Sequence, residues 1–299
     1  MKGYTALRET AGWLELAGRG KIRLTGEDRA RLLHAMTTNH IQQLTPGTGC
    51  YAFFLTAQGR ILSDVNVLCL PDAFLLDTEP ETRQTVYAHL DKYIIADDVL
   101  LEDITPELTT IVLEGPQAGA LLAKTRTPSL DCEYDHREWN QCRVVRMPGG
   151  GFFLLTPPAQ REALVQQLES AGAAAADAEA FQVVRIEQGR PRYGEDISER
   201  FLAQEANQPH ALHFQKGCYL GQEIVERVRS RGQVHRMLMP VEIDSTEPPL
   251  PGTKLPWGEI TSAAYSPALN KVVALAYVRT ELATSGAELP VPDHKAFVR

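Results

Sequence analysis

The residues best suited to chemistry lie in one eight-residue stretch, Lys216-Gly217-Cys218-Tyr219-Leu220-Gly221-Gln222-Glu223. It combines a cation, a thiol, two glycines, an amide and a carboxylate, a mixture that a hydrophobic core does not need. The glycines on either side of Cys218 let backbone N–H groups approach a ligand closely. Lys216, together with a helix that begins just downstream, would favour the thiolate form of Cys218. The alternative is a tight turn around a buried structural cysteine.

Further side chains could take part in such a site. Asp64 lies on a strand that otherwise alternates apolar and polar residues, and its ordinary alternative is a solvent-facing acid. Glu187 lies at the end of a helix, just before the glycine turn that begins at Gly189, and could equally form a surface ion pair. Tyr193 and the acidic pair 195–196, in the same turn, could bind a ligand or only shape the loop.

A basic run follows the first stretch in an otherwise acidic chain. Runs of this kind are usually solvated faces, but a cationic patch beside a reactive cysteine could hold an anionic ligand tail or a nucleic-acid phosphate. Arginine suits this role because its planar fork pairs with a carboxylate through two hydrogen bonds. The members of the run are Arg227, Arg229, Arg231, His235 and Arg236.

The bulk properties are those of a globular protein with two or three domains. The 299 residues are 43% hydrophobic and 23% charged, and the net charge of −8 argues against a whole-surface nucleic-acid or membrane binder. The five cysteines are widely spaced and form no C-x-x-C, so neither a disulfide framework nor a metal site is indicated. We expect no signal peptide, no membrane span and a reducing cytoplasm as the location.

The apolar pattern of the first 170 residues predicts an antiparallel sheet with helices on one face, an α+β arrangement. Two early strands, 11–16 and 21–25, are expected to form a hairpin. Thr25 is expected to cap the helix that follows, and a capping box, Thr78-x-x-Glu81, to open another. The remaining strands are expected at 51–56, 60–70, 73–77, 99–104, 109–114, 139–147 and 152–156, the last two as a hairpin across Gly149-Gly150-Gly151.

The composition changes twice toward the C-terminus. The alanine-rich segment 172–176 is the best candidate for a linker, and Asp177 is expected to cap a helix that runs to about Gln188. Beyond the basic run, strands separated by proline- and glycine-rich loops predict a small all-β domain. These strands are expected at 236–243, 260–265 and 272–278.

Four blocks of the sequence, at 25–39, 59–64, 185–196 and 216–223, resemble in this order the YgfZ-type folate-binding proteins, which are relatives of the aminomethyltransferase (T-protein) of glycine cleavage. The stretch 216–223 resembles the family's K-G-C-Y-x-G-Q-E signature. A chance match of four blocks in the same order is very improbable. The other three blocks are Thr25-Gly26-Glu27-Asp28-Arg29 with Leu32-Leu33 and Thr37-Thr38-Asn39; Gly59-Arg60-Ile61-Leu62-Ser63-Asp64; and Arg185-Ile186-Glu187-Gln188-Gly189 with Pro191 and Tyr193-Gly194-x-Asp196.

The resemblance implies an architecture. It is a three-domain ring of the aminomethyltransferase type, with ferredoxin-like α+β parts, a small C-terminal β-barrel, and tetrahydrofolate in the central channel. The corresponding division of the chain is a folate-binding α+β domain (1–47 with 177–230), a ferredoxin-like α+β domain (48–176) and a barrel domain (231–299).

The resemblance also implies the roles of individual residues. Glu187 would accept the adjacent N–H and amino group of the pterin as a bidentate pair. Asp64 matches the acid that lies near the reactive folate nitrogen in the transferase branch, and Arg227 would meet the anionic glutamate tail. The other cofactor contacts are assigned to Tyr193, Gln222 and Glu223.

Three positions depart from the patterns of these relatives. The residue of the T-protein that matches Cys218 is not usually cysteine. Asp77 stands where the transferase branch has an asparagine, which weakens a simple transfer of the methylene chemistry. The segment before Glu205 lacks the proline usually seen there.

The function expected first is that of a tetrahydrofolate-binding accessory factor for the assembly or repair of iron–sulfur proteins, with Cys218 as a thiolate that Lys216 keeps ionised. Iron–sulfur clusters normally have four ligands, so a client or assembly protein, or a second copy, would share any cluster. The alternative is a folate-dependent one-carbon (aminomethyl or methyl) transferase or demethylase, with Asp64 as the acid–base residue. A third, weaker interpretation is an RNA-binding module that uses the basic run. A link to tRNA modification is compatible with the first function, without direct RNA binding.

Overall fold

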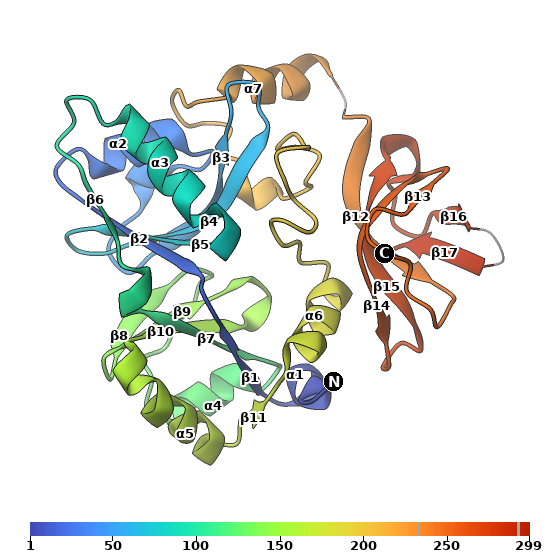
Figure 1. Cartoon of the computed structure of the whole chain (residues 1–299), viewed down its shortest axis with the longest axis horizontal. Helices are drawn as coiled ribbons and strands as arrows, with labels where there is room; N and C mark the ends of the chain where they lie inside the picture. The colour runs from blue at the N-terminus through green and yellow to red at the C-terminus, as the bar shows by residue number, and fades with distance from the viewer. Residues whose placement is uncertain (233, 292–293) are drawn as a thin grey trace. The chain divides into compact units, whose positions relative to one another are not determined.

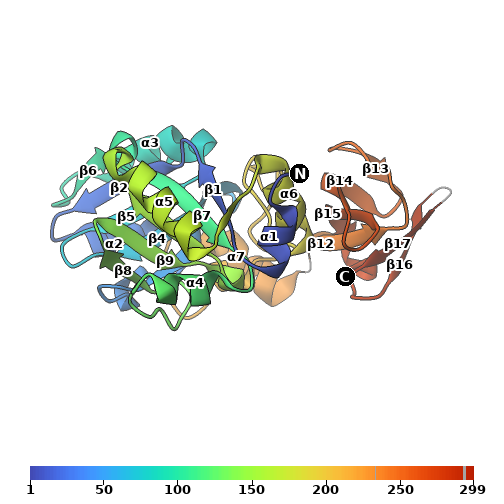
Figure 2. The ribbon, with the colours of Figure 1, turned by 90° about the horizontal axis from the view of Figure 1, so that it is seen from below.

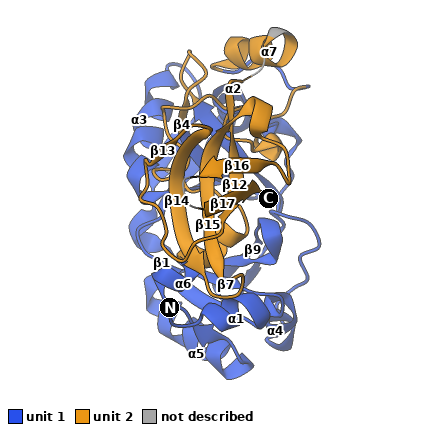
Figure 3. Cartoon of the chain, turned by 90° about the vertical axis from the view of Figure 1, so that its right-hand side faces the viewer, with its two compact units in different colours: residues 1–54, 63–181, 215–219 blue, residues 55–62, 182–214, 220–299 orange. Residues whose placement is uncertain are grey.

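The computed structural model describes residues 1–232, 234–291 and 294–299 (Figure 1). The chain forms two compact units, shown in different colours in Figure 3. Unit 1 comprises residues 1–54, 63–181 and 215–219, and unit 2 comprises residues 55–62, 182–214 and 220–299. Among the described residues, no helix has both the length and the apolar character needed to cross a membrane.

The first sheet belongs to unit 1. It has the strand order β11-β1-β7-β10-β9-β8, and apart from the parallel pair β1–β11 its neighbours are antiparallel. Figures 1 and 2 show α4 (Ala118–Lys124) and α5 (Arg161–Ala171) next to one another on one face of this sheet. Their apolar residues complete a core with Ile111, Leu113 and Leu154. The strands are β1 (Gly12–Leu16), β7 (Thr109–Glu114), β8 (His136–Trp139), β9 (Cys142–Arg146), β10 (Phe152–Thr156) and β11 (Ala174–Ala175).

The second sheet carries the strand on which Asp64 lies. Its order is β3-β4-β5-β2-β6, and the neighbouring helices are α2 (Arg29–Met36) and α3 (Arg83–Tyr93). Ile22 and Leu24 of β2 and Leu76 of β5 are fully buried, as expected for strands that are covered by other elements. The strands are β2 (Gly20–Thr25), β3 (Gly49–Leu55), β4 (Ile61–Cys69), β5 (Phe74–Thr78) and β6 (Leu100–Asp103).

The third sheet forms the C-terminal part of unit 2. Its order is β13-β14-β15-β12-β17-β16, and a bulge between Ile260 and Ser262 interrupts the pairing of β14 with β15. Every second side chain of β15 points into the barrel core; these residues are Val272, Ala274, Ala276 and Val278. The strands are β12 (Arg236–Ile243), β13 (Lys254–Leu255), β14 (Gly258–Ser266), β15 (Lys271–Arg279), β16 (Glu288–Val291) and β17 (His294–Val298).

Helices and short 3-10 turns connect the sheets. The helices not yet named are α1 (Tyr4–Glu9), α6 (Ala178–Glu187) and α7 (Gln222–Arg231). Asp177 caps α6 as predicted, because its Oδ1 accepts a 2.8 Å hydrogen bond from the N–H of Ala180. The 3-10 turns are Ile41–Gln43, Pro80–Thr82, Thr105–Glu107, Pro148–Gly150, Pro158–Gln160, Pro209–Ala211 and Thr280–Leu282.

Several local predictions are confirmed. The expected β-domain strands correspond to β12, β14 and β15. The hairpin across the triple glycine corresponds to β9 and β10, although residues 139–147 are divided, because Asn140 and Gln141 turn the chain at positive φ. The domain boundaries given above stay a prediction.

The expected hairpin of 11–16 with 21–25 is wrong. β1 pairs with β7 in the first sheet and β2 pairs with β5 in the second. The physical reason lies in the buried cations that flank Gly20, since Arg19 and Lys21 both bind Asp77 of β5. This pairing holds β2 against β5 instead of β1.

The caps expected at Thr25 and at the Thr78 capping box are wrong, and so is the expected linker. Asp28, not Thr25, is the N-cap residue of α2, and Thr82 is that of α3, because Thr78 still belongs to β5 and a 3-10 turn follows it. The alanine-rich segment 172–176 contains β11, which pairs with β1, so it belongs to the first sheet.

Candidate functional site

Asp64 is a buried acid. Together with Asn66, two residues later on the same face of β4, it is only 8% exposed, so the solvent-facing alternative is wrong. The Tyr51 hydroxyl donates a 2.9 Å hydrogen bond to Asp64 Oδ2. Burial and the nearby charge of Glu79 raise the pKa of Asp64 from the ordinary 3.8 to about 7, although the Tyr51 bond and Arg19 oppose this rise. Asp64 can therefore take up or release a proton near neutral pH.

Asp77 lies in the same sheet but in the opposite electrostatic environment. The register aligns Asn66, Asp77 and Lys21 across β4, β5 and β2. Asp77 accepts bonds from Arg19 Nη2 (2.6 Å), Lys21 Nζ (2.8 Å) and Asn66 Nδ2 (2.8 Å), and the Tyr134 hydroxyl donates to Asn66 Oδ1 (3.1 Å). Burial disfavours the carboxylate, but the two cations outweigh burial and hold the pKa of Asp77 below its ordinary range. Asp77 thus stays ionised.

This contrast between Asp64 and Asp77 was not predicted from the sequence. Two carboxyls whose environments push their pKa values apart are a common feature of sites that handle protons. The sequence signal that could have found the network is the pair of cations, Arg19 and Lys21, at the start of an apolar strand. Such cations need a buried acid as partner.

Lys216 is buried, and its ammonium is bound to backbone. It donates to the carbonyl oxygens of His34 (2.5 Å), Thr37 (2.5 Å) and Asn39 (2.8 Å) at the C-terminal end of α2. Burial lowers the pKa of Lys216 to about 7, while these acceptors favour its charged form. An ammonium has three donors, so a hydrogen bond to Cys218 would require the loss of one of these bonds. The structure therefore does not provide the expected direct stabilisation of a Cys218 thiolate by Lys216.

Cys218 is exposed, so the alternative of a buried structural cysteine is wrong. α7 begins at Gln222, four residues later, and a helix dipole acts mainly within the first turn, so Cys218 lies outside its main reach.

Gly221 is the N-cap residue, at a φ of 85°, and a Cβ there would lie 2.7 Å from the Thr56 carbonyl oxygen. Only glycine fits this turn. Within the described residues, no group of three His, Cys, Asp or Glu side chains is placed to hold a metal ion.

Glu187 is the last residue of α6 in unit 2. It is 7% exposed, and its Oε1 accepts a 2.6 Å hydrogen bond from the Ser266 hydroxyl on β14. Arg299 donates to its backbone carbonyl oxygen at 2.6 Å. Glu187 is thus buried and does not lie on the surface. A carboxylate has about four acceptor positions, so Glu187 has the chemistry to receive two N–H donors from a ligand.

Asp196 organises the loop after α6. This fully buried carboxylate accepts from Arg185 Nη1 (2.6 Å) and from the hydroxyls of Thr261 (2.6 Å) and Ser262 (2.7 Å) on β14. It therefore shapes the loop, one of the two roles left open for this segment. Tyr193, in the same loop, donates from its hydroxyl to the Ile61 carbonyl oxygen at 3.3 Å.

The remaining candidates lie on or after α7. Glu223 and Arg227 are exposed and Gln222 is partly buried. Arg229 lies over the ring of Phe214 at 4.5 Å. Arg236, in contrast, is held by Glu205 at 3.0 Å, and the side chain of Arg231 lies outside the described part of the chain. The members of the basic run therefore have different environments.

Comparison with known proteins agrees with the fold. Residues 2–216 match the GCVT N-terminal domain, and residues 236–296 match the glycine cleavage T-protein C-terminal barrel domain. The aminomethyltransferase of Rubrobacter xylanophilus is 28% identical over 97% of this chain and 82% of its own length. A chloroplastic protein of Arabidopsis thaliana, named a transferase without a stated substrate, is 27% identical over 94% of this chain and 68% of its own.

A solved structure shows the same architecture. The glycine cleavage system aminomethyltransferase T from Bartonella henselae superimposes with a TM-score of 0.86, covering 99% of this chain and 87% of that one at 20% identity. The expected aminomethyltransferase-type α+β fold with a C-terminal barrel is confirmed. The chain therefore belongs to the GCVT family, with an aminomethyltransferase-like N-terminal domain followed by the family's C-terminal barrel.

Proposed function

We propose that this protein binds tetrahydrofolate and acts as an accessory factor in the assembly or repair of iron–sulfur proteins, with Cys218 as the group that meets the client. The second part rests on one observation: the Cys218 thiol is exposed on a loop in which the side chain of Lys216 is bound to three backbone carbonyls. A fixed loop presents the thiol in one orientation, which favours exchange with a partner protein.

Each of the two buried acids has a proposed role toward the folate. Tetrahydrofolate supplies a basic ring nitrogen that carries one-carbon units. Glu187 would accept the pterin's neighbouring N–H and amino groups, and its attachment to Ser266 fixes the orientation of the carboxylate. Asp64 would hold or move a proton near the reactive nitrogen. The other proposed contacts are Tyr193, Gln222, Glu223 and Arg227.

Cys218 alone does not provide the ligands of a cluster. A cluster normally has four, so the partner, either a client protein or a second copy of this chain, would supply the others. Cys132 is also exposed, and so provides a matched control thiol in the same chain.

A second candidate, a folate-dependent one-carbon transferase or demethylase, is favoured by the raised pKa of Asp64. An acid with a pKa near 7 is well suited to general acid–base catalysis at neutral pH. In this case Asp64 would be the catalytic group and Cys218 would be dispensable.

The two candidates are separated by three variants in cells that lack the protein. Cys218→Ser is expected to abolish support of iron–sulfur enzyme activity, Cys132→Ser to retain it, and both to bind tetrahydrofolate like the wild type. Full activity of Cys218→Ser would refute the thiol role. Formation of methylenetetrahydrofolate from an aminomethyl donor, lost in Asp64→Asn but kept in Cys218→Ser, would establish the transferase instead.

Folate binding needs its own experiment. Calorimetric titration of the purified chain with tetrahydrofolate is expected to show binding that Glu187→Ala weakens about tenfold or more, because the pterin loses a charged bidentate partner. Absence of binding by the wild type would refute the central proposal, whatever the phenotype of Cys218→Ser.

A further inference from the structure

Asn66 is a buried amide of β4 that uses only part of its hydrogen-bonding capacity. Its Nδ2 donates to Asp77 Oδ2 at 2.8 Å, and its Oδ1 accepts from the Tyr134 hydroxyl at 3.1 Å. An asparagine side chain has two N–H donors and two acceptor positions. Among the described residues the side chain has no third partner, so one N–H stays open although Asn66 is only 8% exposed.

The orientation of this amide is fixed by its two partners. Asp77 is held in its ionised form by Arg19 and Lys21, and a carboxylate can only accept, so the nitrogen end of the amide faces it. The opposite orientation would turn the Asn66 oxygen toward the Asp77 carboxylate and place two acceptors against each other. The register that pairs Asn66 with Asp77 across β4 and β5 holds the two side chains in this arrangement.

Asp64 lies beside this amide on the same strand. Alternate side chains of a strand share a face, and positions two apart are separated by about 7 Å along it. Among the described residues the Asp64 carboxyl accepts from the Tyr51 hydroxyl alone. A carboxyl that can hold a proton and an amide with an open N–H therefore share one buried face of β4, and each has hydrogen-bonding capacity left for a ligand.

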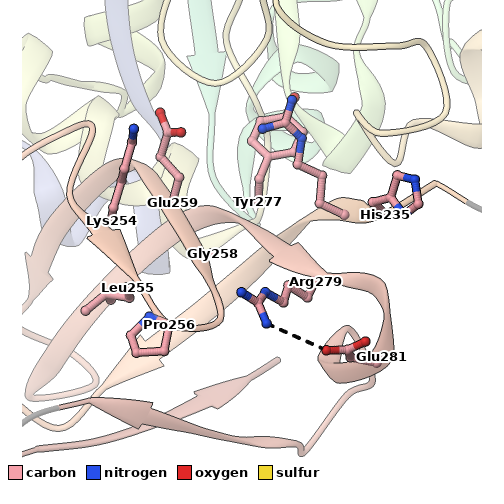
Figure 4. A pocket seen from close by; sticks show the side chains of 10 residues that line it. His235, Lys254, Leu255, Pro256, Gly258, Glu259, Tyr277, Arg279 and Glu281 are labelled. Carbon is pink, nitrogen blue, oxygen red and sulfur yellow. Dashed lines mark ion pairs between the residues drawn. The ribbon is translucent and has the colours of Figure 1, made fainter.

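Charged groups of the barrel cavity differ in this respect. The cavity has a volume of about 490 Å³, and its Arg279 pairs with Glu281 at 4.0 Å, as the dashed line in Figure 4 shows. Glu259 lines the same cavity and is bound by Arg200 through both carboxylate oxygens at 3.0 Å. These four groups already have partners, whereas Asn66 lacks an acceptor.

The acceptor that Asn66 lacks is present in a reduced pterin. Such a ring carries a carbonyl directly next to the nitrogen that takes up one-carbon units, so a ligand whose nitrogen meets Asp64 brings a carbonyl oxygen to the same side. We propose that the open N–H of Asn66 donates to this ring carbonyl and thereby orients the pterin beside Asp64. The inference rests on the proposed folate binding and makes Asn66 a residue that determines which ring is accepted.

Tetrahydrofolate and tetrahydroaminopterin test this contact, because the second ligand has an amino group, a donor, in place of the ring carbonyl. In calorimetric titrations of the full chain, Asn66→Leu is expected to bind tetrahydrofolate about tenfold more weakly than the wild type does, and tetrahydroaminopterin within about twofold of it. The second ligand also lacks the N–H that Glu187 would accept, so the measure is the change of the affinity ratio between the two proteins. Gln84→Leu, which removes an exposed amide of α3, is expected to leave both affinities unchanged.

The outcomes separate this contact from a structural role and from folate binding itself. Equal weakening of both ligands in Asn66→Leu would overturn the contact and leave the folate proposal standing, because a purely structural asparagine affects both ligands alike. Absence of tetrahydrofolate binding by the wild type would overturn both. If Asn66→Leu does not fold or tetrahydroaminopterin binds neither protein, NMR of the wild type decides. Tetrahydrofolate is expected to shift the open side-chain amide proton of Asn66 downfield, and an unmoved resonance overturns the contact.

Discussion

Replacing Asp64 by asparagine is expected to stabilise the protein above neutral pH. The pKa of Asp64 in the folded protein, about 7, lies above the ordinary 3.8, so between these two values the folded state binds more protons than the unfolded state. Stability therefore falls as the pH rises from about 4 to about 7. At 1.36 kcal/mol per pH unit, the loss approaches roughly 4 kcal/mol above pH 7.

Asparagine removes this pH-dependent loss, because it cannot ionise and its Oδ1 can still accept from the Tyr51 hydroxyl. The gain relative to wild type is expected to be on the order of 2–4 kcal/mol at pH 8 and close to zero at pH 4. Urea denaturation at several pH values between 4 and 8 measures it directly, and carbon NMR of the Asp64 carboxyl gives its pKa.

The control for this experiment is Asp72→Asn, a change at an exposed aspartate of the same unit that is expected to leave the pH profile of stability unchanged. If Asp64→Asn and wild type lose stability in parallel between pH 4 and 8, Asp64 is not the buried acid with a raised pKa described above. A carboxyl resonance that titrates near pH 4 would refute the same reasoning.

Three further substitutions test the scaffold around the site, each by urea denaturation. Lys216→Met is expected to destabilise the protein by about 2–4 kcal/mol, since three buried carbonyls lose their donor; a change below about 0.5 kcal/mol would contradict that anchoring role. Asp196→Ala is expected to destabilise the protein by about 3–5 kcal/mol, because the buried Arg185 loses its closest acid. Wild-type stability of this variant would show that Glu195 alone compensates the charge of Arg185. Gly221→Ala is expected to destabilise it by about 1–3 kcal/mol, because of its positive φ and the close Thr56 carbonyl, and an unchanged midpoint would show that the turn can move.

The fold was predictable where periodicity alone decides the structure. The barrel strands and the Asp177 cap follow from local pattern. The pairing of β1 and β2 in different sheets was not predictable, because it depends on the burial of Arg19 and Lys21 against Asp77, which is far away in sequence. Local propensity does not report such a long-range ion pair.

The candidate residues could be named from the sequence, but the environment of each could not. The four sequence blocks contain Asp64, Glu187, Lys216 and Cys218, and the structure shows the first three buried and the thiol exposed. The partner of Lys216 could not be deduced from its neighbour Cys218. Its ammonium instead reaches backbone carbonyls about 180 residues earlier in the chain, a contact that only tertiary structure creates.

The comparison of Asp64 with Asp77 bears on function more directly than either residue alone. Asp77 is buried with Arg19, Lys21 and Asn66 as donors, so its burial is compensated and needs no functional explanation. Asp64 has only one donor in the described structure, the Tyr51 hydroxyl. The folded protein therefore loses stability when Asp64 ionises. Uncompensated groups of this kind concentrate at functional sites, where a ligand provides what the protein lacks.

A basic nitrogen placed beside Asp64 would share its proton and remove the penalty, which is the chemistry that a reduced folate offers. Folate binding is thus the part of the proposal that accounts for Asp64 under either candidate function, and the Cys218 experiments then decide what the bound folate is used for.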